Sequence, residues 1–351
     1  MGDDDAVTDG DGAGTPSIRG FRLPAATAPH ERCLISWPTL RRFDFWRSHL
    51  GAARDTYGII ARAINEYEPV LVIADEGEGR AAEQWLRGEV EVIELPIDDS
   101  FVRDNGPLFV VDGEGRRRAV HFGFNAWGEK LESWDRDATL AEPLCAHLGI
   151  EVVTVPMVLE GGSICVDGAG TLVATEQCLL NPNRNPQLGR DDIEAHLRTN
   201  LGVDTIVWLA SGLDSDWGTD GHVANVVSFI EPGAVLLQST SDPDDPDRRV
   251  ARQNEDRLTK AGIDSHVLDV LPHVECFDEL VEVPYVNLYV ANGAVFVPLA
   301  GAAADKEILR QIEGVFPGRD VIGVPGRVLA YGGGGILGIT QPVPAAAPLG
   351  P

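Results

Sequence analysis

One structural unit recurs along the chain, and it limits the folds available more than any other feature of the sequence. In each copy an apolar strand leads into a polar or glycine-containing segment, which is followed by an alternating strand, a tight X-Gly turn and another apolar strand. Asp-Gly, Pro-Gly and Asn-Gly pairs form these turns, as is typical of hairpins. Four full copies, and a fifth that stops after its second strand, span residues 92–122, 152–176, 205–239, 267–300 and 321–342.

A repeated unit of this size predicts a closed α/β ring, because each copy can bury its apolar faces only against its neighbours. Helical patterns at 183–201, 247–262 and 304–315 lie between the copies, and a helix at 47–67 precedes a buried strand at 70–75. The alternative is an ordinary open α/β sheet with hairpins. We favour the propeller-like ring, since the turn residues recur at the same place in the copies.

Equivalent positions of the repeat carry chemically active side chains. In a ring such positions converge on the central axis, so an acid, a second acid and a histidine from separate copies would share one pocket. Singly, each has an ordinary explanation as a turn residue, a surface acid or a satisfied buried histidine. Together they predict a functional site. At the start of the second strand the copies carry, in order, Arg103 with Asp104, Glu160, His222, Tyr285 with Asn287, and Gly338.

The net charge of the chain bears on what such a pocket would bind. Lys and Arg number 28 against 55 Asp and Glu, which gives a formal net charge of −27 in 351 residues. A surface of this kind repels nucleic-acid phosphates and anionic lipid, so we expect neither a nucleic acid nor a membrane as partner. It attracts small cations such as a guanidinium or an amine, although the charge also has a simpler explanation as an adaptation for solubility.

The remaining composition predicts a cytoplasmic protein without a cofactor. The five cysteines are an odd number and form no Cys-x-x-Cys pair, which argues against disulfides and thiolate zinc sites. No metal-ligand cluster or phosphate-binding loop is evident in the sequence. We expect an acidic disordered tail at 1–17, one domain at 18–344 and a Pro/Ala-rich tail at 345–351, without a signal peptide or a membrane span. A homo-oligomer is compatible with this composition.

Motifs spread over the chain resemble those of the agmatine deiminases, in a wider family that includes bacterial peptidylarginine deiminases. The matching stretches keep the same order, cover nearly all of residues 20–344 and are specific as a set. The resemblance implies the pentein fold, a five-bladed α/β propeller with a central active site, which agrees with the repeat. The stretches are FVRDNGPLFVV, FNAWGEK, LEGGSICVDGAGTL, TEQCLLNPNRNP, TDGHVANVVSFIEPGAVLL, YVNLYVANGAVFVP, FPGRDVIGV and YGGGGILGITQ.

The resemblance also implies an activity and assigns roles to residues. In the family, a cysteine thiolate attacks the guanidinium carbon of agmatine or of an arginine side chain, ammonia leaves, and water releases the ureido product. Two aspartates hold the guanidinium, while a histidine and a glutamate handle protons. Position by position, the first aspartate is Asp104, the glutamate is Glu160 and the histidine is His222. The other residues expected at the substrate are Arg103, Phe101 and Trp127.

Several positions depart from the family's pattern. GTDGHVAN stands where the family usually reads DTDGHVDN, so Ala224 replaces the second guanidinium-binding aspartate and Gly218 replaces an acid that helps to place the far end of the substrate. GGGGILGITQP stands for GGGNIHCITQQ, which puts Gly338 at the nucleophilic cysteine and Leu337 at its histidine neighbour. Phe101 replaces a tryptophan. Because glycine cannot be a nucleophile, the covalent route would need another residue.

Two cysteines lie in or near these motifs. Cys165 lies five residues beyond Glu160, and this odd offset points it to the other face of a strand, unless a bulge at Gly161 and Gly162 restores it. We expect the Cys165 sulfur to pack away from the His222 imidazole and not to replace the nucleophile. We expect Cys178 to be a packing residue.

Three functions remain compatible with the sequence. The chain is a working deiminase with unusual residues, or it binds a small guanidino or amino compound and uses His222, Glu160 and Asp104 for non-covalent acid–base chemistry, or it is a non-catalytic relative that binds a ligand or a partner. The absent thiol argues against the first function. The intact scaffold motifs favour the second and third over random decay.

Overall fold

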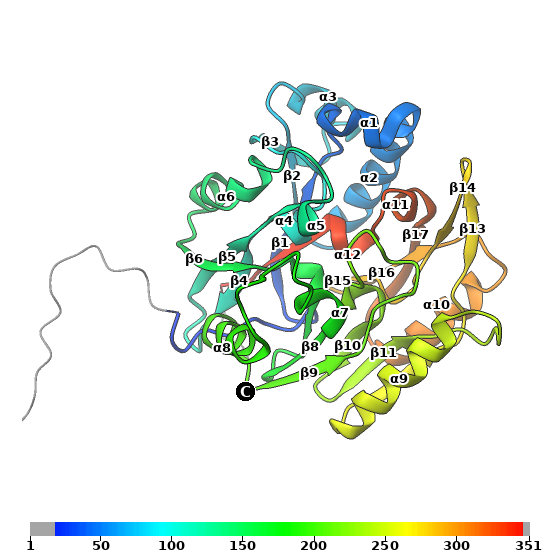
Figure 1. The fold of residues 1–351 in the computed structure, drawn as a ribbon. Helices are drawn as coiled ribbons and strands as arrows, with labels where there is room; N and C mark the ends of the chain where they lie inside the picture. Colours follow the sequence, from blue (N-terminus) through cyan, green and yellow to red (C-terminus); the bar gives the residue numbers. More distant parts are fainter. Residues whose placement is uncertain (1–17, 347–351) are drawn as a thin grey trace, which may run out of the picture.

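A computed structural model describes residues 18–346 and arranges them as a ring of five small sheets around a central axis (Figure 1). Four sheets have three strands, of which the first two pair antiparallel and the last two pair parallel. The strands of these sheets are β4 (Leu108–Val111), β5 (Arg117–Gly123) and β6 (Val152–Val158); β7 (Ile164–Val166), β8 (Thr171–Thr175) and β9 (Thr205–Leu209); β10 (Val227–Glu231), β11 (Ala234–Gln238) and β12 (Asp264–Leu268); and β15 (Tyr289–Ala291), β16 (Ala294–Leu299) and β17 (Asp320–Pro325).

The fifth sheet joins the two ends of the chain and closes the ring. Its order is β18 (Thr340–Pro344), β1 (His30–Ser36), β2 (Val70–Ala74) and β3 (Glu91–Glu94). β18 pairs antiparallel with β1, and β1 pairs parallel with β2. The fifth copy of the repeat, which stops after its second strand in the sequence, is thus completed by strands that precede the first copy.

Helices cover the outside of the ring, as Figure 1 shows for α6, α8 and α9. The predicted helical segments correspond to α2, α8, α9 and α10, each shorter than the pattern at one or both ends, most of all α8, which begins at Arg190 rather than at residue 183. The helices are α1 (Phe43–Trp46), α2 (Leu50–Asn65), α3 (Gly79–Trp85), α5 (Ala126–Glu129), α6 (Ala141–Leu148), α7 (Glu176–Leu179), α8 (Arg190–Leu201), α9 (Asp247–Lys260), α10 (Asp305–Val315) and α11 (Arg327–Tyr331), with 3₁₀ turns η1 (Leu40–Arg42), η2 (Arg47–His49) and η3 (Asp137–Thr139). A separate hairpin consists of β13 (His273–Cys276) and β14 (Glu279–Glu282).

The cores lie between the sheets and their covering helices. The apolar stripe of α8, which includes Ile193 and Leu197, packs against a cluster that contains Leu172 of β8. In the next but one sheet, Ile308 and Ile312 of α10 pack with strand residues of β16. The helices thus pack on the outer side of the sheets. The segments that lead into the first strands lie at the central axis instead.

A short helical turn precedes the first strand of four sheets, and these turns lie close together in space. α4 packs against both α12 and η4, and η4 packs against η5. Of the residues singled out in the sequence as strand starts, Arg103, Asp104 and Gly338 lie in these turns, and Glu160 and His222 lie directly before them. The turns are α4 (Val102–Asn105) before β4, η4 (Gly161–Ser163) before β7, η5 (Val223–Asn225) before β10 and α12 (Ile336–Ile339) before β18.

Two expectations concern the ends and the surface of the chain. The acidic tail expected at 1–17 lies outside the described residues, as do residues 347–351 of the Pro/Ala-rich tail. Within residues 18–346, no helix is both long and apolar enough to cross a membrane.

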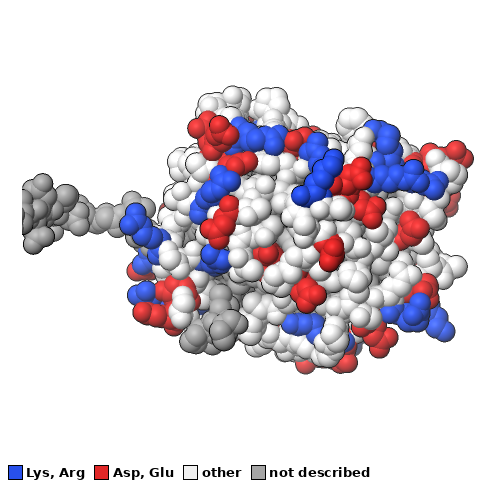
Figure 2. Space-filling model, turned by 90° about the horizontal axis from the view of Figure 1, so that it is seen from below, with Lys and Arg blue, Asp and Glu red and all other residues white. Residues whose placement is uncertain are grey.

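Figure 2 shows one face of the molecule, on which acidic and basic side chains are interspersed rather than segregated by sign.

Candidate active site

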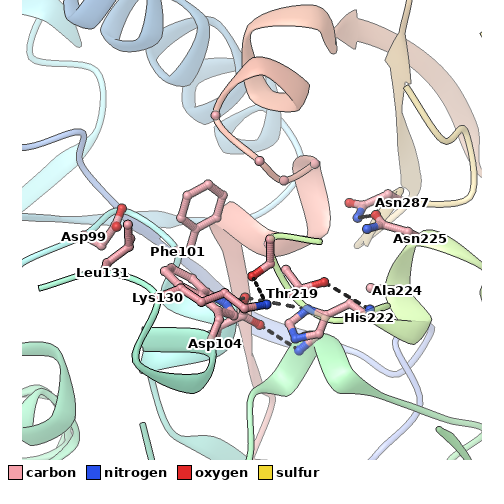
Figure 3. A pocket seen from close by; sticks show the side chains of 18 of the residues that line it. Asp99, Phe101, Asp104, Lys130, Leu131, Thr219, His222, Ala224, Asn225 and Asn287 are labelled. Carbon is pink, nitrogen blue, oxygen red and sulfur yellow. Dashed lines mark hydrogen bonds and ion pairs between the residues drawn. The ribbon is translucent and has the colours of Figure 1, made fainter. Parts of the chain in front are cut away.

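A pocket with a volume of about 140 Å³ lies where the helical turns meet, and we call it the front pocket (Figure 3). Four residues from the equivalent repeat positions, Asp104, His222, Asn287 and Gly338, line it. Glu160 is not in the lining but lies directly behind His222. Other predicted substrate-site residues in the lining are Phe101, Trp127, Ala224 and Gly218, and the remaining lining residues include Phe45, Asp99, Lys130, Thr219, Asn225 and the glycines 332–335.

His222 lies between two carboxylates. Its Nδ1 atom is 3.9 Å from Asp104 Oδ2, and its Nε2 atom is 3.8 Å from Glu160 Oε2. Burial alone would lower the pKa of His222, but the charge of Asp104 and the close approach of Cys178 and Glu160 outweigh it and raise this pKa well above its ordinary value. The imidazole is therefore expected to carry a proton at neutral pH.

Asp104 presents its carboxylate to the front pocket. Its Oδ1 accepts a hydrogen bond from the Gly162 amide at 2.8 Å, and its Oδ2 accepts one from the Trp127 indole at 3.0 Å. Burial raises the pKa of Asp104, and the charge of His222 and the Trp127 hydrogen bond oppose that rise. The other acid in the lining, Asp99, is bound by Arg42 at 2.9 Å, so Asp104 is the carboxylate best placed to meet a cationic ligand.

A buried arginine holds Glu160. Arg184 Nε donates to Glu160 Oε1 at 2.7 Å and Arg184 Nη1 donates to Asp220 Oδ2 at 2.5 Å, and the side chains of Glu160 and Arg184 are 0% exposed. Burial would raise the pKa of Glu160, but the nearby imidazole of His222 and the charge of Arg184 lower it. Negative and positive groups thus alternate from Asp104 through His222, Glu160 and Arg184 to Asp220, and each buried charge has an opposite neighbour.

The thiol beside His222 belongs to Cys178. The Cys178 sulfur, a His222 nitrogen and a Glu160 carboxylate oxygen all lie within 4.8 Å of one another. Cys178 is fully buried outside the pocket lining, and burial raises the pKa of its thiol. These three residue types can bind metals, but the Arg184 guanidinium on Glu160 disfavours a cation there. Cys165 lines a different cavity, which agrees with our expectation that it is not a nucleophile.

The glycine-rich segment forms a wall of the front pocket that has no side chains. A Cβ atom at Gly334 would lie 2.5 Å from Phe101 Cε1, so the backbone and this ring are in close contact. At Gly338 the backbone does not adopt the left-handed conformation, and a Cβ atom would lie 3.2 Å from Phe101 Cδ1. A side chain at position 338 therefore requires the Phe101 ring to shift by a few tenths of an ångström.

The mouth of the front pocket has few free charges. Ala224 of η5 contributes only a methyl group to the lining. Gly218 has open space where a Cβ atom would be. Its carbonyl oxygen accepts a hydrogen bond from Lys130 Nζ at 3.2 Å, and this ammonium pairs with Asp220 at 2.8 Å. The positive charge at the mouth is thus already neutralised within the protein.

Trp127 lies in α5, whose backbone is a strained loop with left-handed residues and not a regular α-helix. Ala126, Trp127, Gly128 and Glu129 have φ values of 51°, 55°, 91° and 61°, and three of these four are not glycine. Consecutive left-handed residues of this kind are rare and tend to occur at functional sites. The bend directs the indole nitrogen to Asp104 and packs the ring edge-on against Phe101, with centroids 5.7 Å apart.

Arg103 does not line the front pocket, in contrast to the expected substrate contact. Its Nε donates to the Leu337 carbonyl oxygen at 3.3 Å, and its side chain lines a second cavity. Arg103 and Asp104 are neighbours in the turn α4, and consecutive side chains of a helical turn point about 100° apart. The turn that directs Asp104 into the front pocket therefore directs Arg103 away from it.

The ring of five sheets around a buried acid–histidine pocket defines a pentein-type fold, and the sequence assigns the family. Residues 22–344 match the Porphyromonas-type peptidyl-arginine deiminases. The chain is 40% identical over 364 residues to an agmatine deiminase of Stutzerimonas stutzeri, and 39% identical over 364 residues to one of Pseudomonas aeruginosa; each match covers 94% of this chain and 97% of the relative. The chain belongs to this deiminase family.

Solved structures confirm the predicted fold class. The agmatine deiminase of Enterococcus faecalis superposes with a TM-score of 0.90 at 33% identity and covers 95% of this chain and 98% of its own. A cysteine-to-serine variant of the C. jejuni agmatine deiminase with substrate bound superposes with a TM-score of 0.85 at 26% identity, over 92% of this chain and 96% of its own. The resemblance read from the motifs is therefore correct at the level of family and fold.

Proposed function

We propose that the front pocket binds a small guanidino or amino cation and does not carry out covalent deimination. One observation carries the proposal: the lining keeps Asp104 and His222 but receives neither a thiol nor a second free carboxylate, because Gly338 and Ala224 stand at those places. Membership in a family of guanidino-processing enzymes supports the ligand class. The substrate-bound C. jejuni relative supports a small ligand in an equivalent fold.

Binding of such a cation would use Asp104 and the aromatic walls. An N–H group of the ligand would donate to Asp104 Oδ2, which already accepts a bond from Trp127. The rings of Phe101 and Trp127 would stabilise the positive charge through cation–π contacts, each contributing about 0.5–2 kcal/mol. A protonated His222 at 3.9 Å from the same carboxylate competes with the ligand, so binding would displace its proton.

Catalysis without a thiol at position 338 has little support. The nearest thiol to His222 is Cys178, which is buried outside the lining and whose pKa is raised by burial, so it is a poor nucleophile. His222, with a raised pKa, is a proton donor at neutral pH and not a base able to activate water. Ligand binding without turnover is therefore the function that the arrangement favours over non-covalent hydrolysis.

The test measures ammonia release and ureido product from agmatine and from arginine. We expect no turnover by the wild type, by Gly338→Cys or by Ala224→Asp, since each single variant lacks either the nucleophile or the second carboxylate. The double variant Gly338→Cys/Ala224→Asp should recover measurable turnover once the Phe101 ring yields to the new side chain. Wild-type turnover at about 1 s⁻¹ or more, a rate typical of enzymes, would overturn the proposal.

Ligand binding is tested separately by thermal shift and calorimetry with agmatine, arginine, guanidine and polyamines. At least one of these cations should raise the unfolding temperature increasingly with its concentration, because a ligand that binds only the folded state stabilises it. A panel in which no cation binds would refute the ligand class even if turnover is absent.

A further inference from the structure

A second cavity lies behind the wall of the front pocket, and we call it the rear cavity. Its volume is about 90 Å³. The wall between the two cavities is only one helical turn of the chain in thickness. Gly162 and Gly338 line the front pocket, whereas their preceding neighbours Gly161 and Leu337 line the rear cavity. The same alternation holds at the turn α4, where Asp104 faces the front and Arg103 the rear.

The guanidinium of Arg103 has no acidic partner. Its one hydrogen bond goes to a backbone carbonyl, that of Leu337, and no carboxylate within residues 18–346 lies within 4 Å of it. The acid next to it in the sequence, Asp104, faces the other pocket and is bound by Trp127 and Gly162. Arg103 is partly buried, and burial lowers the pKa of its guanidinium. An unpaired guanidinium in such a place favours a bound anion.

A second polar group in the rear cavity also lacks a partner. Gln341 is 2% exposed and lines the cavity, and its Oε1 atom makes no hydrogen bond within the described part of the chain. Its amide nitrogen is fixed by the Pro107 carbonyl oxygen at 2.9 Å, so the oxygen is the free end. His30, by contrast, is satisfied by Glu68 at 3.2 Å. Because an amide oxygen accepts hydrogen bonds, Gln341 Oε1 cannot contact an anion favourably, so Arg103 is the charged donor that this cavity offers to one.

Apart from Ser228, the rest of the lining is apolar. Leu108, Phe109, Ile164, Phe229 and Val290 contribute to it, and the half-buried Cys165 adds a small thiol. One guanidinium in apolar surroundings matches an ion with one planar anionic group and a hydrocarbon tail. The planar guanidinium of an arginine can donate two parallel hydrogen bonds to the two oxygens of a carboxylate. Inorganic phosphate, which has no apolar part and needs more donors, fits this lining less well.

We propose that the rear cavity is a binding site for a short aliphatic carboxylate, whose oxygens accept hydrogen bonds from Arg103 and whose tail packs on the apolar wall. A four-carbon acid such as butyrate is the appropriate probe for a cavity of about 90 Å³. This site is separate from the cation site of the front pocket and does not depend on it.

The first experiment titrates butyrate, acetate and inorganic phosphate at constant ionic strength and follows binding by calorimetry and unfolding temperature. Butyrate should bind the wild type at least tenfold more tightly than phosphate. Arg103→Gln should weaken butyrate binding at least tenfold, because it removes a charge-assisted bidentate contact. Arg310→Gln is the matched control: it removes the same charge from an exposed position on α10 and should bind butyrate like the wild type.

The outcomes are decisive in both directions. Equal butyrate affinity in wild type and Arg103→Gln would overturn the proposal, as would equal or tighter binding of phosphate. A uniform effect of all three anions on wild type, Arg103→Gln and Arg310→Gln would mean a non-specific salt effect and would also overturn it. A failed front-pocket assay with agmatine leaves these results unaffected, so the two proposals fail separately.

A second measurement on the wild type covers the case in which Arg103→Gln does not fold. Cys165 is the half-buried thiol of the five, whereas Cys33, Cys145, Cys178 and Cys276 are buried. A maleimide applied at pH 9 should therefore label Cys165 first, although slowly, since burial raises the pKa of this thiol to about 11. Butyrate should slow this labelling at least several-fold, while agmatine should not. Labelling that is indifferent to butyrate would contradict the site.

Discussion

The front pocket and the rear cavity share one wall, but their charged side chains differ in whether they have neighbours of opposite charge. In the front, Asp104, His222, Glu160 and Arg184 alternate in sign, so each buried charge is neutralised by a neighbour. In the rear, Arg103 stands without an acidic partner among apolar side chains. The difference arises over a single peptide bond, between residues 103 and 104.

This contrast predicts different effects on the stability of the fold for substitutions in the front pocket and in the rear cavity. Removing one member of a paired buried network leaves the other member uncompensated, which destabilises the fold strongly. Removing an unpaired charge leaves nothing uncompensated, so stability should change little while ligand binding is lost. The predictions below test this difference in order of expected size.

The largest effect is expected from Glu160→Ala. It leaves the fully buried Arg184 without its 2.7 Å partner and should lower the free energy of unfolding by about 3–5 kcal/mol. The control is Glu176→Ala. The ion pair between Glu176 and Arg190 is partly exposed, so it should contribute about 1 kcal/mol or less to stability. The rear counterpart is Arg103→Met, which loses one hydrogen bond and should change stability by about 1 kcal/mol or less.

Urea unfolding monitored by far-UV circular dichroism measures all three variants. A loss below about 1 kcal/mol for Glu160→Ala would show that the charges behind the front pocket are not coupled as their geometry indicates. A loss for Arg103→Met as large as that for Glu160→Ala would remove the distinction between the two cavities.

An intermediate effect is expected on ligand affinity, with opposite selectivity in two variants. Asp104→Asn removes the charge that faces the front pocket and should weaken agmatine binding more than tenfold, which corresponds to the roughly 1.5–3 kcal/mol of a charged hydrogen bond. It should leave butyrate binding within about twofold. Arg103→Gln should do the reverse. Calorimetry measures the affinity of both variants for both ligands. If either variant lost affinity for agmatine and for butyrate together, the substitution would have disrupted the shared wall and not a single site.

A smaller, graded effect is expected from pH. The folded-state pKa of His222 is raised, so its contribution to stability is complete below the ordinary histidine pKa and is lost as pH rises through the folded-state value. Agmatine must displace the same proton, so its affinity should rise with pH by up to about tenfold per unit until His222 is neutral. Both trends should flatten in His222→Gln.

The rear cavity provides the internal control for this pH series. Butyrate binding at Arg103 should stay level over the same range, because neither the guanidinium nor the carboxylate changes charge near neutral pH. Calorimetry between pH 6 and 9 measures both ligands. Agmatine affinity that is independent of pH in the wild type would contradict the assignment of a protonated His222 at the front pocket.

Much of the fold could be read from the sequence because it rests on local patterns. Strand alternation, Gly-containing turns and helical periodicity repeat often enough to define a ring, and the helix at 50–65 with the strand at 70–74 was predicted to within a few residues. The partner of the incomplete fifth copy was not predicted. β18 pairs with β1, and a pairing between strands some 300 residues apart leaves no local signal.

The candidate site was predicted in part for the same reason. Asp104, His222 and Gly338 occupy equivalent places in a repeat, so their convergence follows from symmetry alone. Cys178 is fully buried in a hydrophobic core cluster, as predicted for a packing residue. Its place beside His222 was not predicted, since it lies in a different segment of the repeat. The strained loop at 126–129 was also missed, because alanine, tryptophan and glutamate carry no signal for left-handed backbone.

The sequence by itself thus determined the ring, its family, and the residue types available at the axis, since these depend on periodicity and on motifs in a fixed order. Only the tertiary structure decided which side of the wall each residue faces. Arg103 and Asp104 are adjacent and equally polar, and the motif suggested a common role for them. The hydrogen bonds from Gly162 and Trp127 to Asp104, and from Arg103 to Leu337, come from distant segments and hold the two side chains in separate cavities.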